Sequence, residues 1–291
     1  MPVVSPTQPS HPASPLDAEP DIAAANPAAA TPPPLEALHG RRKDLVPLLV
    51  VAAIAIVALP LVGSIPTWVT LTVAGLAMGM MLFIMASGLT LVFGLMDVLN
   101  LGHAAFVTIG AYVATSLAVL LAGLLSSNSA LEALAGMALA ALGAMIVTAL
   151  LGWAFERLFI RPVYGNHLRQ ILITIGAMII IEQLVLAVWG PQQMLLPLPA
   201  SVRGSFVFGD IAVERYRLVA VVLGLALYLG LVLIFNRTRI GLLIRAGVEN
   251  REMVEALGYR IRLVFIGVFV TGTALAGLGG TMWAFYREQF T

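Results

Sequence analysis

Residues 68–94 read WVTLTVAGLAMGMMLFIMASGLTLVFG, a stretch of 27 residues without a charged side chain. As an α-helix this stretch would be about 40 Å long, which exceeds the roughly 30 Å hydrocarbon core of a bilayer. Because lipid cannot hydrogen-bond to backbone groups, such a stretch crosses a membrane as a helix or within a closed barrel. The stretch lacks the alternation of apolar and polar residues that barrel strands show, so we predict a transmembrane helix.

Six more apolar runs extend this prediction to most of the chain. The sequence is 60% hydrophobic and only 11% charged, whereas about a quarter of the residues of soluble globular proteins are charged. We therefore predict an all-α integral membrane protein, a polytopic transmembrane helix bundle with about seven spans in a domain of residues 41–291. The spans are predicted at residues 45–63, 68–94, 98–125, 131–155, 171–189, 218–235 and 263–285.

The basic side chains predict the orientation of these spans. If the N-terminus is cytoplasmic, twelve of the sixteen basic residues lie on the cytoplasmic side, within residues 41–43, 157–169 and 237–262. Arg203, Arg215, Arg217 and Arg287 lie outside, as the positive-inside rule requires. Seven spans place the two termini on opposite sides of the membrane, and this odd number suggests that the natural chain continues past Thr291.

Residues 1–40 have a different composition. They hold most of the 17 prolines and few large apolar side chains, so they cannot bury enough surface to offset the entropy of ordering. We predict a disordered cytoplasmic tail. A cleaved signal peptide is the alternative, but the basic cluster at residues 41–43 comes too late in the chain for one. The absence of cysteine excludes disulfides and thiolate metal sites.

Small residues recur every four positions in the seventh span, at Gly272, Ala276 and Gly280. Such a stripe lets helix backbones approach closely, which is how helices associate in lipid. We predict a helix-packing surface here. The pattern leaves open whether the contact lies within the chain or with a second subunit.

Polar side chains inside the apolar runs are candidates for a translocation path. Asp97 lies between the second and third runs and Asn100 and His103 at the start of the third, and Gly94 and Gly102 flank Asp97 and Asn100. One interpretation is a turn at the cytoplasmic face; the other is a helix broken within the bilayer, whose freed backbone groups line a polar path. Glu182 lies within the fifth span, where a charge is costly in lipid, so we expect it to face the bundle or water.

Two loops are long enough to carry structure. Residues 190–217 are predicted to lie outside and to contain a hairpin, with Gly209-Asp210 as the turn. Residues 236–262 are cytoplasmic and are predicted to contain a helix of two turns that begins after the N-cap Asn250 and ends at Gly258. This helix would expose an apolar face suited to a groove on a partner, although an interfacial helix lying on lipid is the alternative. The predicted contact residues are Asn250, Glu252, Met253, Val254, Glu255, Ala256, Leu257 and Gly258.

These residues resemble a known family, the membrane-spanning permease subunits of ABC importers for branched-chain amino acids, whose relatives carry urea and short amides. Three blocks carry the resemblance: residues 88–114 with Leu99–His103 and Gly110–Tyr112, residues 156–162, and residues 237–258 continuing into the seventh span. The resemblance implies a second similar permease subunit, two ATP-binding subunits inside, a solute-binding protein outside, and a bacterial inner membrane. It also implies that residues 250–258 couple the subunit to its ATPase. The chain departs from the family in its proline-rich tail and in lacking the eighth span that usually follows.

The sequence itself narrows the choice of function. Its single lysine, Lys43, follows no phosphate-binding glycine loop, so ATP must be hydrolysed on another subunit. A secondary transporter that uses Asp97, His103 or Glu182 for ion coupling is the second hypothesis. No pattern typical of an intramembrane enzyme, a cofactor or metal site or a nucleic-acid surface is present in the sequence. The sequence does not identify the transported solute.

Overall fold

The computed structural model describes residues 46–192, 194–196 and 198–290, and the predicted disordered tail at residues 1–40 lies outside them. The chain divides into two units, residues 1–53 and 54–291. The description below concerns the second unit, except that helix α1 (Val46–Val62) belongs to both.

Six described helices are long and apolar enough to cross a membrane. The predicted first span corresponds to α1, which is apolar but shorter than the other six. The predicted fourth span corresponds to α5, which continues through a π-helical turn and a 3-10 turn as far as Val163. The six are α2 (Ile65–Met96), α3 (His103–Leu120), α5 (Ala130–Phe155) with its turns η4 (Glu156–Ile160) and η5 (Arg161–Val163), α6 (His167–Trp189), α7 (Arg215–Arg237) and α10 (Ile261–Arg287).

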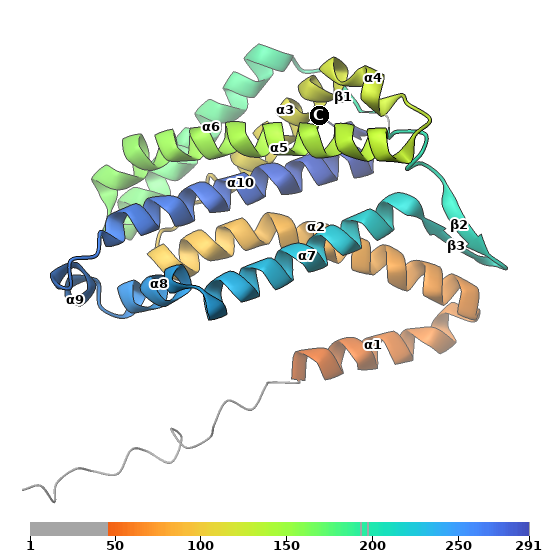
Figure 1. Ribbon diagram of the computed structural model, residues 1–291, viewed down its shortest axis with the longest axis horizontal. Coiled ribbons are helices and arrows are strands. Elements are labelled where there is room, and N and C mark those ends of the chain that lie inside the picture. The colour runs from red at the N-terminus through yellow and green to blue at the C-terminus, as the bar shows by residue number, and fades with distance from the viewer. Residues whose placement is uncertain (1–45, 193, 197, 291) are drawn as a thin grey trace, which may run out of the picture. The chain divides into compact units, whose positions relative to one another are not determined.

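These helices run between two ends of the bundle (Figure 1). The basic end holds residues 97–102, 156–166 and 238–260, and nine of the described arginines lie there or in the adjoining helix ends. The hairpin end holds residues 121–129, with the short helix α4 (Ala122–Leu125), and residues 190–214. Four described arginines lie at the hairpin end, namely Arg203, Arg215, Arg217 and Arg287.

Helix α10 lies at the centre of the bundle and packs against α2, α3 and α5. The three residues of the predicted packing stripe are all buried there. A Cβ atom built on Gly272 would come within 2.7 Å of the Gly88 carbonyl oxygen of α2, and one on Gly280 would collide with the Val107 carbonyl of α3. The close approaches of the stripe therefore lie within this chain.

The loop at the hairpin end is partly buried. Strands β2 (Ser205–Phe208) and β3 (Ile211–Glu214) form the predicted hairpin, which is confirmed with its Gly209-Asp210 turn. Before the hairpin, Leu196 and Val202 are buried in a core cluster with side chains of α10. Strand β1 (Met194–Leu195) pairs with β4 (Gln289–Phe290), which follows α10. The loop is thus attached to the end of the central helix.

The basic end contains a helix that we did not predict from the sequence. Residues 236–262 form α8 (Arg239–Glu249) and then the short helix α9 (Arg251–Ala256). Thr238 caps α8, its hydroxyl accepting a hydrogen bond from the Gly241 amide at 3.3 Å. Isoleucine and leucine side chains give α8 one apolar face, of which Ile244 is buried. The predicted cytoplasmic loop is therefore two helices joined at Asn250.

Candidate functional site

The chain re-enters the bundle between α2 and α3. Helix α2 is unbroken to Met96 and ends at Asp97, which adopts the left-handed conformation with φ of 52°. The ring of His103, the first residue of α3, lies 3.1 Å (Nε2 to O) from the Met85 carbonyl. Met85 precedes the end of α2 by eleven residues, or about 16 Å along the helix. Residues 97–102 therefore run back into the bundle without helical structure.

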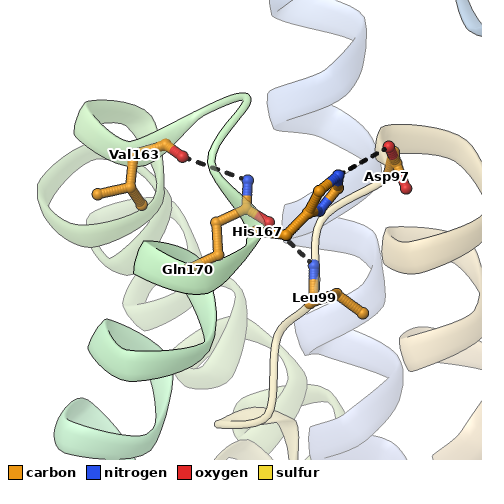
Figure 2. Close-up of polar contacts among 5 residues, drawn as sticks. All are labelled: Asp97, Leu99, Val163, His167 and Gln170. Atoms are coloured by element: carbon orange, nitrogen blue, oxygen red, sulfur yellow. Dashed lines mark hydrogen bonds and ion pairs between the residues drawn. The ribbon is translucent and has the colours of Figure 1, made fainter.

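Side chains of α6 hydrogen-bond to this re-entrant segment (Figure 2). Gln170 accepts a hydrogen bond from the Leu99 amide at 3.2 Å and donates one to the Val163 carbonyl at 3.4 Å. Thr174 accepts from the Leu101 amide at 3.3 Å. Lipid offers no partner for such amides, so irregular backbone at this depth depends on polar side chains of this kind. Helix α6 thus holds the re-entrant segment in place.

Buried polar atoms of two side chains, in the segment and directly after it, lack hydrogen-bond partners. Asn100 is 2% exposed, and neither its amide nitrogen nor its amide oxygen is hydrogen-bonded within the described part of the chain. The Nδ1 atom of His103 is also buried without a partner there. Buried polar groups are rarely left unpaired, and exceptions call for a functional reason or a bound water. Asn100 and His103 are accordingly the polar groups here that are free to bind something else.

A cavity of about 600 Å³ opens at the basic end beside the re-entrant segment. Asp97 and His167 lie in its wall with their side chains 3.6 Å apart (Oδ2 to Nε2). Figure 2 shows the two side chains pointing toward each other. Both side chains are largely exposed, so their attraction is weak. The far wall comes from the end of α8 and the start of α9. The lining includes Phe93, Tyr164, Gln170, Val248, Arg251 and Phe265.

A second cavity, of about 190 Å³, shares part of this wall. It is lined by Glu156, Arg161 and Arg262 together with Tyr164, Arg251 and Phe265, the three residues that also line the first cavity. Burial, with a smaller effect of the nearby Glu156 carboxylate, raises the pKa of the Tyr164 hydroxyl, which therefore stays protonated. Arg251 stands between a cavity that contains Asp97 and one that contains Glu156.

Helix α9 has the cap and the stop that its sequence predicted. The Asn250 side chain accepts a hydrogen bond from the Met253 amide at 2.9 Å, and Gly258 has φ of +87°. Met253 and Leu257 are exposed, at 60% and 70%. Val254, in contrast, is only 4% exposed, so the prediction that it belongs to the exposed face is wrong. It packs in a core cluster with Ile261 and Phe265 of α10, because so short a helix needs an anchor.

The other predicted contact residues of α9 are exposed as well. Glu252 and Ala256 are exposed, and Glu255 pairs with Arg251 at 3.1 Å between Oε1 and Nε. The loop exposes Val248 and Tyr259 as well. Four large apolar side chains are therefore exposed in this part of the basic end, namely Val248, Met253, Leu257 and Tyr259.

Glu182 does not join the other predicted path residues. It lies on the exposed side of α6, so it does not face the bundle that the described residues form, as we had expected it could. The buried side of α6 is set by Gln170, Thr174, Ala177 and Val185, and the helical period places Glu182 outside that stripe. No hydrogen bond or ion pair of the described residues connects Asp97, His103 and Glu182 to one another.

Sequence reasoning missed Gln170, Thr174 and His167. All three lie in the first two turns of α6, and their role depends on a segment about 70 residues earlier in the chain. Thr174 lies within the predicted span at residues 171–189, and His167 and Gln170 precede it closely, but position in the sequence does not reveal which backbone groups these side chains contact.

Comparisons with known proteins relate the chain to the permease components of transport systems. The family model described as branched-chain amino acid transport system / permease component matches residues 71–291. The permease protein BraD of the high-affinity branched-chain amino acid transport system of Pseudomonas aeruginosa is 30% identical over 217 residues, which cover 72% of this chain and 68% of BraD. The LivH permease proteins of Salmonella typhimurium and Escherichia coli K12 are each 26% identical over 214 residues, again 72% of this chain and 68% of the relative. No solved structure matches the chain.

Proposed function

The chain belongs to the permease components of branched-chain amino acid transport systems, and from this premise we propose that it is the membrane-spanning permease subunit of an ATP-driven importer. Its solutes are branched-chain amino acids, as the names of its relatives indicate. The observation that carries the proposal is the extent of the family match, which runs from residue 71, within α2, through the rest of the six-helix bundle and includes helices α8 and α9.

Three kinds of partner follow from this proposal. Two ATP-binding subunits dock at the basic end, on the surface of Val248, Met253, Leu257 and Tyr259, with residues 250–258 as the coupling element. A solute-binding protein docks at the hairpin end, and a second permease subunit lies alongside in the lipid bilayer. The contrast between nine arginines at the basic end and four at the hairpin end supports a cytoplasmic basic end. With α1 as a further crossing, the N-terminus is also cytoplasmic in this proposal, and the membrane is a bacterial inner membrane.

The translocation path that we propose leaves through the larger cavity at the basic end. Asp97 lies at its mouth, and Asn100 and His103 supply unpaired polar atoms deeper in the bundle. Glu182, on the exposed side of α6, would contribute to a path only where another subunit covers that side. Because Asp97, His103 and Glu182 form no connected relay, the arrangement gives no support to a secondary transporter driven by ions.

Uptake into proteoliposomes tests the proposal. The subunit is reconstituted with its ATP-binding and permease partners and supplied with binding protein, ATP and labelled leucine, urea or a short amide. We expect ATP-dependent accumulation of leucine above the other two solutes. Accumulation that persists without ATP and follows an imposed proton or sodium gradient would favour the secondary transporter instead.

A further inference from the structure

Glu156 is a buried carboxylate that the proposed path does not use. It is 2% exposed and begins the π-helical turn η4 at the end of α5. It forms no hydrogen bond or ion pair within the described part of the chain. Burying a charge is costly unless neighbouring charges compensate it, and π-helical turns occur often at functional sites. The position of Glu156 therefore needs an explanation.

The compensating charges come from neighbouring arginines. The cavity that contains Glu156 is lined by Arg161 of its own segment, by Arg251 at the start of α9 and by Arg262 in the first turn of α10. The positive charges that act on the Glu156 carboxylate are those of Arg262, Arg161 and Arg157, while Arg251 lines the same cavity of about 190 Å³. The lower the local dielectric, the stronger this attraction becomes, and Glu156 lies in the buried wall.

Arg251 is held so that it faces this cavity. Its Nε atom lies 3.1 Å from the Glu255 carboxylate one turn further along α9, and its guanidinium lies 5.7 Å from the centre of the Phe265 ring of α10. Val254, buried against Ile261 and Phe265, fixes the other side of α9. The orientation of α9 is therefore set by its contacts with α10, and Arg251 lines the cavity that also contains Glu156.

We propose that Glu156 is a positioning residue that holds the start of α10 against the end of α5 through its attraction to Arg262, and with it the coupling helix α9, which packs on α10 through Val254. A displacement of α9 by a bound ATPase then shifts the start of α10 relative to α5, and these two helices pack against each other within the bundle. Because Arg251 also lines the larger cavity, the same displacement changes the wall of the solute exit. The inference rests on the proposed function for the role of the ATPase; the hold on α9 does not depend on it.

Hydrogen exchange on the purified full chain tests the hold on α9 without any partner. In Glu156→Gln, exchange of the amides of residues 251–256 rises by about tenfold relative to wild type, while the amides of α3 stay protected. Glu156→Asp restores most of the protection because it retains the charge. Glu132→Gln, at the exposed opposite end of α5, is the matched control and changes nothing in α9. Unchanged exchange in α9, or a rise throughout the bundle in Glu156→Gln, overturns the proposal.

A double-mutant cycle in the reconstituted transporter tests the consequence. Glu156→Gln and Arg262→Gln each lower the leucine transported per ATP hydrolysed by about tenfold, and the double variant loses no more than either single variant. Additive losses, or an unchanged ratio, overturn the transmission role. If the wild-type complex shows no ATP-dependent uptake, the proposed function fails, and the exchange experiment still decides whether Glu156 positions α9.

Discussion

A few polar side chains allow backbone without helical hydrogen bonds to lie inside an otherwise apolar bundle. Gln170 and Thr174 accept hydrogen bonds from the amides of Leu99 and Leu101. Lipid would offer these two amides no acceptor. Asn100, one residue from each of these amides, keeps its own side chain unpaired. Hydrogen bonds therefore hold the backbone of residues 97–102, while the polar atoms of the Asn100 side chain are unpaired.

Gln170→Leu should destabilise the subunit by about 1–3 kcal/mol, because it leaves the buried Leu99 amide without an acceptor. The measurement is thermal unfolding of the purified subunit in detergent. Gln183→Leu is the control, since Gln183 lies on the exposed side of the same helix and should change the stability by about 0.5 kcal/mol or less. Equal effects of the two substitutions would show that Gln170 does not support the segment.

Asp97→Asn should leave leucine uptake within about twofold of wild type and should not alter its pH dependence, because its exposed pair with His167 contributes little. Glu182→Gln is expected to behave in the same way. The assay is uptake into proteoliposomes across a pH series, with His167→Gln as the partner control. A pH dependence that disappears in either variant would argue for ion coupling and against our proposal.

At the scale of elements, α9 shows how a short helix can hold a fixed position. Asn250 caps its start, Gly258 ends it, and Val254 anchors it in the core. The remaining apolar side chains, Met253 and Leu257, are then left exposed. A helix fixed in this way can transmit displacement, whereas an unanchored two-turn helix would unfold.

Met253→Asp and Leu257→Asp should each reduce the ATP-binding subunit retained in co-purification by at least about tenfold, because an unpaired charge would enter the docking surface. Insertion into the membrane should be normal. Leu131→Asp, at an exposed position of the hairpin end, is the control and should retain the ATPase. If both α9 variants keep the ATPase and its solute-stimulated hydrolysis, α9 is not the coupling element and lies on lipid instead.

The β2–β3 hairpin is the corresponding element of the opposite end. Val207 and Phe208 are exposed, while Arg215 lies over the ring of Phe206 at 5.1 Å from its centre. Replacing residues 207–212 by two glycines should weaken docking of the solute-binding protein by about tenfold. Assembly with the ATPase, measured in the same preparation, should not change. An unaltered docking affinity in the shortened subunit would refute the role of the hairpin.

At the scale of the whole molecule, the bundle depends on close approach of backbones to α10. Helices in lipid gain no hydrophobic drive from association, so packing between small residues has to supply it. Gly272 approaches Gly88 of α2 and Gly280 approaches Val107 of α3, while the Tyr216 hydroxyl of α7 donates a hydrogen bond to the Met282 carbonyl at 2.6 Å. Helix α10 thus connects α2, α3 and α7.

Gly272→Leu should destabilise the bundle by about 3 kcal/mol or more, because even a Cβ atom would come within 2.7 Å of the Gly88 carbonyl oxygen. The measurement is the fraction of monodisperse protein after detergent extraction and heating. Gly267→Leu is the matched control on the same helix, since nothing lies within 4 Å of its added Cβ. A Gly272→Leu subunit as stable as the Gly267→Leu subunit would mean that the close approach is not required.

The sequence by itself determined the class of the protein, the approximate ends of its apolar helices, the β2–β3 hairpin and the cap and stop of α9. These features depend on local properties: apolar length, turn residues and capping side chains act within a few positions of one another. The tertiary structure alone decided which polar groups meet. Gln170 and Leu99, which form a hydrogen bond, are 71 positions apart in the sequence, and Glu156 and Arg251 line the same cavity. Val254 is buried, whereas Glu182 is exposed. Such pairings follow from how the helices pack and rotate against one another, and a pattern along a single helix does not contain that information.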